Sequence, residues 1–185
     1  MNLRNFIADC DLFFYIYAII LLIYIEIRNF MPLKIDNFDK QILSILQRDG
    51  RISNVELADA VHLSESACLR RVRALEDEGL INSFVALLDQ KKVGLTDTVF
   101  VHIVLKREEK SELLAFEEAV KNIPEILECY LMTGEFDYLL HLVVANMADF
   151  ERLHNDALTQ LPGVSRVNSS FAIRTVQKTT ELPLS

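Results

Sequence analysis

Three arginines lie within four positions of one another, in a segment that is otherwise typical of two short helices. Arg70, Arg71 and Arg73 fall between Ser64 and Gly79. A guanidinium group attracts phosphates as a cation, and it can bind a guanine edge through two parallel hydrogen bonds. Three such groups on one helix therefore suit the chemistry of a nucleic-acid duplex, provided that the helix turns them outward.

The surrounding residues predict how that helix is placed. Ser53 and Glu56 form a capping box that starts a first short helix. After a turn, Ser64 can cap a second helix that extends to Glu78 and ends at Gly79. The apolar positions expected to pack between the two helices are Val55, Leu57, Ala58, Val61, Cys68, Leu69, Val72 and Leu75. Two helices joined by a tight turn, the second one basic, are the layout of a helix-turn-helix.

Charge supports this interpretation locally and not over the whole chain. The formal net charge is -8 at pH 7, whereas proteins that bind a duplex present local positive charge. Here the arginines precede an acidic end of the same helix, at Glu76, Asp77 and Glu78. Exposed arginines on a helical hairpin are often only solvated, so these observations alone leave both DNA binding and an ordinary hairpin open.

Cysteines and histidines argue against several other classes of protein. Cys10, Cys68 and Cys129 are odd in number and have no metal-binding spacing, which fits a reducing compartment such as the cytoplasm. We interpret His102 and His141, both in expected strands, as structural side chains. The sequence carries no nucleophile–base pattern and no glycine-rich phosphate loop. We therefore expect a protein that is not an enzyme and that has neither a metal nor another cofactor.

Residues 12–25 form an uncharged apolar run without an amphipathic period. The run is shorter than the about 20 residues that span a bilayer, and it lacks the basic start and cleavage site of a secretory signal. From Met31 onward the sequence is that of an ordinary soluble protein. We expect translation to start at Met31, with residues 1–30 as translated upstream sequence. The alternative is a regulator tethered to the membrane by residues 12–25.

Beyond this run, the sequence predicts an α+β protein of two domains. An amphipathic helix at 36–48 gives the helix-turn-helix its core, and β-like runs at 80–81 and 84–88 suit a wing or a linking strand. Strands and helices then follow in the order β-α-β-β-α-β, at residues 98–106, 111–122, 126–132, 138–144 and 149–161, with the fourth strand contained within 164–177. We expect Ser111 and Asp149 to cap the two helices. This order is a ferredoxin-like sandwich whose open, apolar sheet face is buried in a partner subunit.

Several motifs occur in one order along the chain, at residues 39–58, 63–76, 128–140, 161–164, 169–172 and 179–183. Together they cover about Ile35 to Leu184 and resemble the leucine-responsive regulatory protein / AsnC (Lrp/AsnC) family of transcriptional regulators. The resemblance implies a winged helix-turn-helix head at 33–82, a linker at 83–97 and a ferredoxin-like domain at 98–185 for effector binding and oligomerisation.

The resemblance also implies partners. Family members bind double-stranded DNA, form homodimers that often assemble into larger discs such as octamers, and commonly sense an amino acid between sensor domains. We expect leucine or another apolar amino acid, and control of genes of amino-acid metabolism. The alternative is a nucleoid-type protein that organises DNA without an effector.

Two sets of site residues follow from the matching positions. The expected DNA-binding residues are Asn54, Ser64, Ser66, Cys68, Arg70, Arg71 and Arg73. The expected effector-binding residues are Met132, Thr133, Gly134, Glu135, Asp137 and Tyr138. The prolines that often enter the family's recognition helix are replaced here by Glu65 and Ala67, so we expect a different preferred DNA sequence. Local chemistry alone favours a hairpin turn with solvated acids at 133–137, and it is the resemblance that favours an effector site there.

The start of translation can be tested by the intact mass of the native protein. We expect a mass that corresponds to a chain beginning at Met31. A mature chain that retains Phe13 to Ile25 would show instead that the apolar run is part of the protein.

Overall fold

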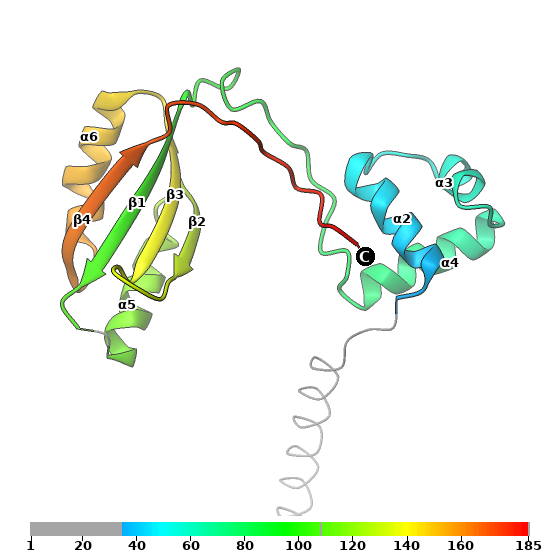
Figure 1. Ribbon diagram of the computed structural model, residues 1–185, viewed down its shortest axis with the longest axis horizontal. Coiled ribbons are helices and arrows are strands. Elements are labelled where there is room, and N and C mark those ends of the chain that lie inside the picture. Colours follow the sequence, from blue (N-terminus) through cyan, green and yellow to red (C-terminus); the bar gives the residue numbers. More distant parts are fainter. Residues whose placement is uncertain (1–34, 108, 185) are drawn as a thin grey trace, which may run out of the picture. The chain divides into compact units, whose positions relative to one another are not determined.

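The computed structural model describes residues 35–107 and 109–184, so the expectations for residues 1–30 lie outside the described residues. The described chain divides into two compact units (Figure 1). The first comprises residues up to Phe84 together with 180–184, and the second comprises Val85–Thr179. The tail at 180–184 therefore differs from the expected second domain, which extended to residue 185. Within the described residues, no helix is long and apolar enough to cross a membrane.

Three helices build the first unit: α2 (Asn37–Arg48), α3 (Asn54–Ala60) and α4 (Glu65–Asp77). The predicted caps are confirmed, since the side chain of Ser53 accepts from the Glu56 amide and that of Ser64 from the Ala67 amide. Asp36 supplies the third cap through a capping box with Asp39. Each cap satisfies amides that a helix start leaves without partners.

Apolar side chains from all three helices form the core of this unit. The buried residues are Ile42, Leu43, Leu57, Ala58, Val61, Cys68 and Leu75. Val55 and Leu69 were expected inside but are 49% and 38% exposed. Because α3 has only seven residues, about two helical turns, it covers a limited part of α4, and the outer apolar positions stay in solvent.

Two residues of positive φ close the turns that flank α4. His62, in the turn between α3 and α4, has φ 57°. Gly79 has φ 74°, and its amide donates to the Glu76 carbonyl at 2.9 Å, which ends the helix as predicted. A left-handed backbone costs a non-glycine residue free energy, so His62 carries strain that Gly79 avoids.

The linking segment differs from the expectation. Residues 82–89 adopt no helix or strand, and the β-like run at 84–88 finds no paired strand among the described residues. Val85, Leu87 and Leu88 are each more than 70% exposed. A strand requires a hydrogen-bonded neighbour, which the described residues of one protomer do not offer.

The second unit confirms the ferredoxin-like order. Its elements are β1 (Asp97–Leu105), α5 (Lys110–Val120), β2 (Ile126–Leu131), β3 (Tyr138–Val144), α6 (Met147–Asp156), a 3₁₀ turn (Leu158–Gln160) and β4 (Val164–Phe171). The sheet has the order β2-β3-β1-β4, and each neighbouring pair is antiparallel. Two predicted caps are wrong by a few residues. Glu109 rather than Ser111 precedes α5, and Asn146 caps α6 by accepting from the Asp149 amide.

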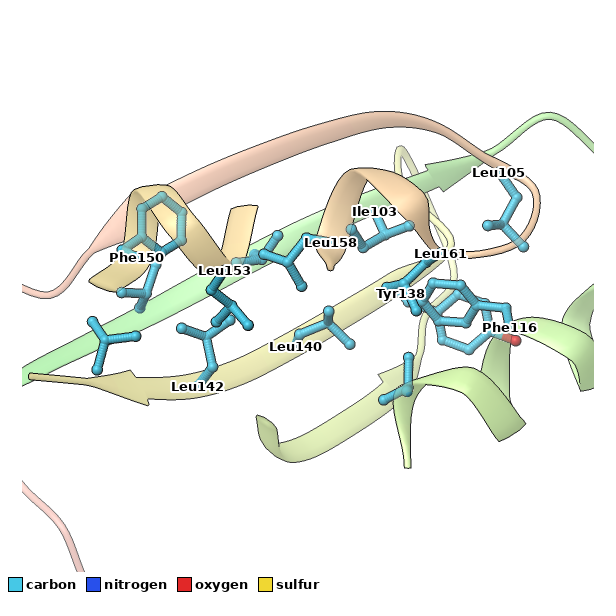
Figure 2. Close-up of a cluster of buried hydrophobic side chains, with 14 residues drawn as sticks. Ile103, Leu105, Phe116, Tyr138, Leu140, Leu142, Phe150, Leu153, Leu158 and Leu161 are labelled. Atoms are coloured by element: carbon cyan, nitrogen blue, oxygen red, sulfur yellow. The ribbon is translucent and has the colours of Figure 1, made fainter. Parts of the chain in front are cut away.

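One face of the sheet carries the core, beneath α5 and α6 (Figure 2). Alternate residues of the two central strands point there: Val99, Val101, Ile103, Leu105, Tyr138, Leu140 and Leu142. Phe116 of α5 and Phe150 of α6 complete this layer. Period-two alternation thus sends one apolar set inward and leaves the other face of β1 and β3 open.

The open face combines aromatic rings with histidines instead of being uniformly apolar. Phe100 stacks on His141 with ring centroids 5.1 Å apart, and His102 lies 4.0 Å from the ring of Phe136. The Nδ1 atom of His141 is 2.9 Å from a carboxylate oxygen of Glu128. Both histidines therefore have the structural partners that were expected of them.

We expect His62→Gly to stabilise the first unit, because glycine adopts φ 57° without strain. The free energy of unfolding should rise by about 0.5–1 kcal/mol, as measured by urea denaturation. The matched control is Gly79→Ala, which places a side chain at positive φ and should lower stability by about 1 kcal/mol. Destabilisation by His62→Gly would show that the imidazole itself supports the turn.

Candidate DNA-binding surface and effector turn

The second helix of the helix-turn-helix, α4, has a buried side and an exposed side. Cys68 and Leu75 point into the core, with 0% and 5% exposure, while Arg70 and Arg73 are exposed. The side-chain amide of Asn54 donates to the Glu65 carbonyl at 3.0 Å, which ties the start of α4 to the start of α3. The helix is thus oriented by its inner face and by a polar contact at its first turn.

Arg71 is held within the protein. Its Nη1 atom lies 2.8 Å from carboxylate oxygens of both Asp36 and Asp39, and its guanidinium carbon is 5.4 Å from the centre of the Phe38 ring. Its side chain is 29% exposed. All three partners come from α2 and its cap, so Arg71 joins α2 to α4. Local sequence patterns do not indicate this pairing, because Arg71 and Asp39 are 32 positions apart.

The seven residues expected to bind DNA therefore separate into three groups. Cys68 is a core residue, and burial raises the pKa of its thiol, so its side chain offers no surface contact. Asn54 and Arg71 hold helices together. The four that remain on the surface are Ser64, Ser66, Arg70 and Arg73. Ser64 also caps α4, with its hydroxyl 3.4 Å from that of Ser66.

In the second unit, the expected effector turn connects β2 to β3. The amide of Met132 donates to the Asp137 carbonyl at 2.8 Å, and Gly134 adopts φ 121°. Thr133, Gly134 and Glu135 are exposed at its tip. These three residues and Met132, which is 37% exposed, are the exposed members of the expected site, and Asp137 is partly buried.

Asp137 anchors this turn to the neighbouring strand β1. Its Oδ2 atom accepts from the Leu105 amide at 2.6 Å, and its own amide donates to the Ile103 carbonyl at 2.9 Å. The register of β1 against β4 shifts between Val104 and Leu105. Such a bulge leaves an amide without a ladder partner, and the Asp137 carboxylate supplies one.

Tyr138 is likewise structural. It is 1% exposed, packs 4.4 Å from the Phe116 ring and donates its hydroxyl to Glu117 at 2.9 Å. Burial first, and then this hydrogen bond, raise the pKa of the Tyr138 phenol above its usual range. In the described chain this side chain is thus part of the core of the second unit.

A cavity of about 460 Å³ lies at the end of the sheet where β1 ends and β4 begins. Its lining residues are Lys106, Arg107, Ser111, Glu112, Ala115, Pro162 and Gly163. Lys106 directly follows Leu105, whose amide binds Asp137, so the cavity and the effector turn share one end of the sheet. Among the described residues, no cluster of histidine, cysteine, aspartate and glutamate is suited to a metal ion.

A helix-turn-helix with outward arginines, joined to a ferredoxin-like domain, defines a DNA-binding regulator with a separate sensor. Comparison with known families agrees: residues 35–82 match the winged helix-turn-helix DNA-binding domain, and residues 98–182 match the Lrp/AsnC ligand binding domain. The chain belongs to the Lrp/AsnC family of transcriptional regulators.

Relatives support the assignment over most of the chain. The DNA-binding transcriptional activator DecR of Escherichia coli K12 is 37% identical over 81% of this chain and 99% of its own. The leucine-responsive regulatory protein of the same strain is 40% identical over 80% and 90%. The structure of the regulator NMB0573 from Neisseria meningitidis, solved with L-methionine, is 39% identical with a TM-score of 0.77, and the alignment covers 80% of this chain and 96% of that one.

Replacing Arg71 should weaken the fold, whereas replacing Arg70 should not. We expect Arg71→Met to lower the melting temperature of the first unit by roughly 2–5 °C, since two carboxylates lose their shared cation. Arg70→Met removes the same charge from the exposed side and serves as the matched control. Equal melting temperatures for the two variants would contradict the structural role of Arg71.

Acid should weaken the contact between Arg71 and Asp36. The hydrogen bond from the Asp39 amide, followed by the Arg71 guanidinium, lowers the pKa of Asp36. A carboxyl whose folded-state pKa is lowered stabilises the fold above its unfolded pKa of about 4, and this contribution is lost as the pH falls through the folded value. We expect Asp36→Asn to flatten the loss of stability below pH of about 4, measured by thermal unfolding across pH. Wild type and Asp36→Asn losing thermal stability with the same slope as the pH falls would contradict this expectation.

Proposed function

We propose that this regulator binds near-palindromic operators as a homodimer, and that Ser64, Ser66, Arg70 and Arg73 of the recognition helix α4 contact the DNA. The two recognition helices of a dimer enter successive major grooves, so half-sites lie about one helical turn apart. The exposure of Arg70 and Arg73 on a helix that is held from its other side is the observation that carries the proposal.

Charge and the helix cap favour this orientation. The two exposed arginines lie in the middle of α4, while Glu76, Asp77 and the cap residue Glu78 make its far end acidic and repel phosphates. Glu65 sits exposed at the start of α4, where its carboxylate can accept hydrogen bonds from amino groups on base edges. We therefore assign guanine contacts to the arginines and expect Glu65 to influence sequence preference.

Two exposed apolar surfaces support a homodimer. The linking segment exposes Val85, Leu87 and Leu88, and the open sheet face exposes Phe100 and Tyr130. Exposed apolar area of this extent is typical of a surface that meets a partner. The linking segment also offers unpaired backbone groups to an equivalent segment of a second copy. Further assembly into discs such as octamers follows the pattern expected of the family.

The ligand of the sensor is proposed to be an amino acid, with leucine or another apolar amino acid preferred. Its carboxylate would accept from amides of the turn at 133–135, where Gly134 leaves room for close approach, and its ammonium would face Glu135. The relatives named for leucine response and solved with L-methionine support an apolar side chain.

The genes of amino-acid metabolism are the proposed targets. Ligand binding regulates only if it favours one assembly or DNA-bound state over another.

DNA contact can be measured by fluorescence anisotropy of the full chain on duplex from its own upstream region. We expect Arg70→Ala and Arg73→Ala each to weaken operator binding by about 1–3 kcal/mol, with Arg152→Ala of α6 as the charge-matched control. Wild-type binding should fall as salt rises and should exceed binding to scrambled duplex. Operator affinity unchanged by both substitutions would refute the assignment of α4.

The effector is tested by repeating these titrations with leucine, methionine and a charged amino acid. We expect an apolar amino acid to shift operator affinity, and Glu135→Gln to weaken that shift about tenfold in ligand concentration without changing affinity in its absence. Lys106→Ala tests the neighbouring cavity as the alternative location. A wild-type chain that binds DNA tightly and responds to no amino acid would favour a DNA-organising protein.

A further inference from the structure

The last described residues of the chain lie against the first helix of the DNA-binding unit. The side-chain amide of Gln47 donates from Nε2 to the Leu182 carbonyl at 3.2 Å, and its Oε1 accepts from the Leu182 amide at 2.6 Å. Nε of Arg48 lies 2.9 Å from a carboxylate oxygen of Glu181. We call residues 180–184 the strap.

The pair of bonds to Leu182 has the geometry of strand pairing. In extended backbone, the amide and the carbonyl of one residue point to the same side, and a hydrogen-bonded strand pair uses both. Pro183 restrains Leu182 to this extended conformation, because the proline ring disfavours a helical residue before it. A glutamine amide carries a donor and an acceptor, so the single side chain of Gln47 takes the part of a neighbouring strand.

The ion pair between Arg48 and Glu181 helps to position the strap more than it stabilises it. The side chains of Arg48 and Glu181 are 66% and 40% exposed, and exposed ion pairs contribute little to stability. Arg48 is nevertheless held in place, since its Nη2 donates to the Ser44 hydroxyl at 2.8 Å within the same helix. The closed pair of hydrogen bonds at Gln47 is therefore the specific part of the contact.

With the strap docked, the chain joins the two units at two places. One junction lies after Phe84 and the other after Thr179. A domain held by one flexible connector samples many positions, and a second connector reduces that number. For a dimer that must place two heads on two half-sites, fewer accessible positions mean a higher effective concentration of the second head.

We propose that the strap belongs to the DNA-binding head, docks on α2 through Gln47, and raises affinity for paired half-sites by restraining the head. This inference rests on the proposed function. The same helix carries Asp39, and the cap Asp36 precedes it, so both ends of α2 are engaged. One end binds the strap and the other binds Arg71 of the recognition helix. The strap thereby connects the end of β4 to α4 through α2.

Docking is tested by amide hydrogen exchange of the full chain, read at Leu182. We expect exchange to be slowed at least about tenfold in the wild type and to return to the unprotected rate in Gln47→Ala. Gln41→Ala is the matched control, because Gln41 is an exposed glutamine of the same helix. Equal exchange at Leu182 in wild type and Gln47→Ala would overturn docking through Gln47.

The restraint is tested by anisotropy on two duplexes, one with both half-sites and one with a single half-site. We expect Gln47→Ala to lose about 3- to 10-fold in affinity for the paired site, to lose none for the single site, and to tolerate altered half-site spacing better. Lost protection at Leu182 with unchanged affinity for the paired site would overturn the restraint. If the wild type binds no operator, the proposed function fails, and exchange at Leu182 alone then decides whether the strap is docked.

Discussion

The DNA-binding unit depends on one constraint: α4 must be a core helix and a recognition surface at the same time. Its thirteen residues give one side to Cys68 and Leu75 and the other to exposed arginines. The packed inner side and the hydrogen bond from Asn54 to the Glu65 carbonyl orient this helix. The bridge from Arg71 to the carboxylates of Asp36 and Asp39 adds a further restraint, since it links α4 to the start of α2. Together these contacts set the direction of Arg70 and Arg73.

The sensor unit uses an acidic residue in a comparable way. Asp137 closes the bulge of β1 by accepting from Leu105, and this bond holds the turn that carries Gly134 and Glu135. In each unit, a charged residue that was expected to contact a ligand instead contacts the protein: Arg71 binds carboxylates of α2 and its cap, and Asp137 binds the backbone of β1. Residues near them in the sequence face solvent. Arg71 and Asp137 hold the elements that carry the two candidate sites, while Arg70 and Glu135 are exposed beside them.

Local rules predicted most of the elements. Capping residues and helical spacing located α3 and α4, and the alternation of β1 and β3 identified the core face of the sheet. What the sequence could not indicate was pairing across long separations, such as Arg71 with Asp39 or Gln47 with Leu182. Adjacent positions with similar side chains, such as Arg70 and Arg71, therefore looked equivalent although their environments differ. The prediction of a linking strand at 84–88 was wrong for a related reason, because these residues have no paired strand among the described residues.

The strap also has a consequence for biosynthesis. Gln47 and Leu182 are 135 positions apart, so the α2 surface emerges from the ribosome long before its ligand is made. The three-helix core is built from residues 42–75, which are all made long before the strap, and it can form during translation. The strap can dock only after it too has been made. A nascent polypeptide that has not yet reached residues 180–184 thus carries a three-helix head without its strap.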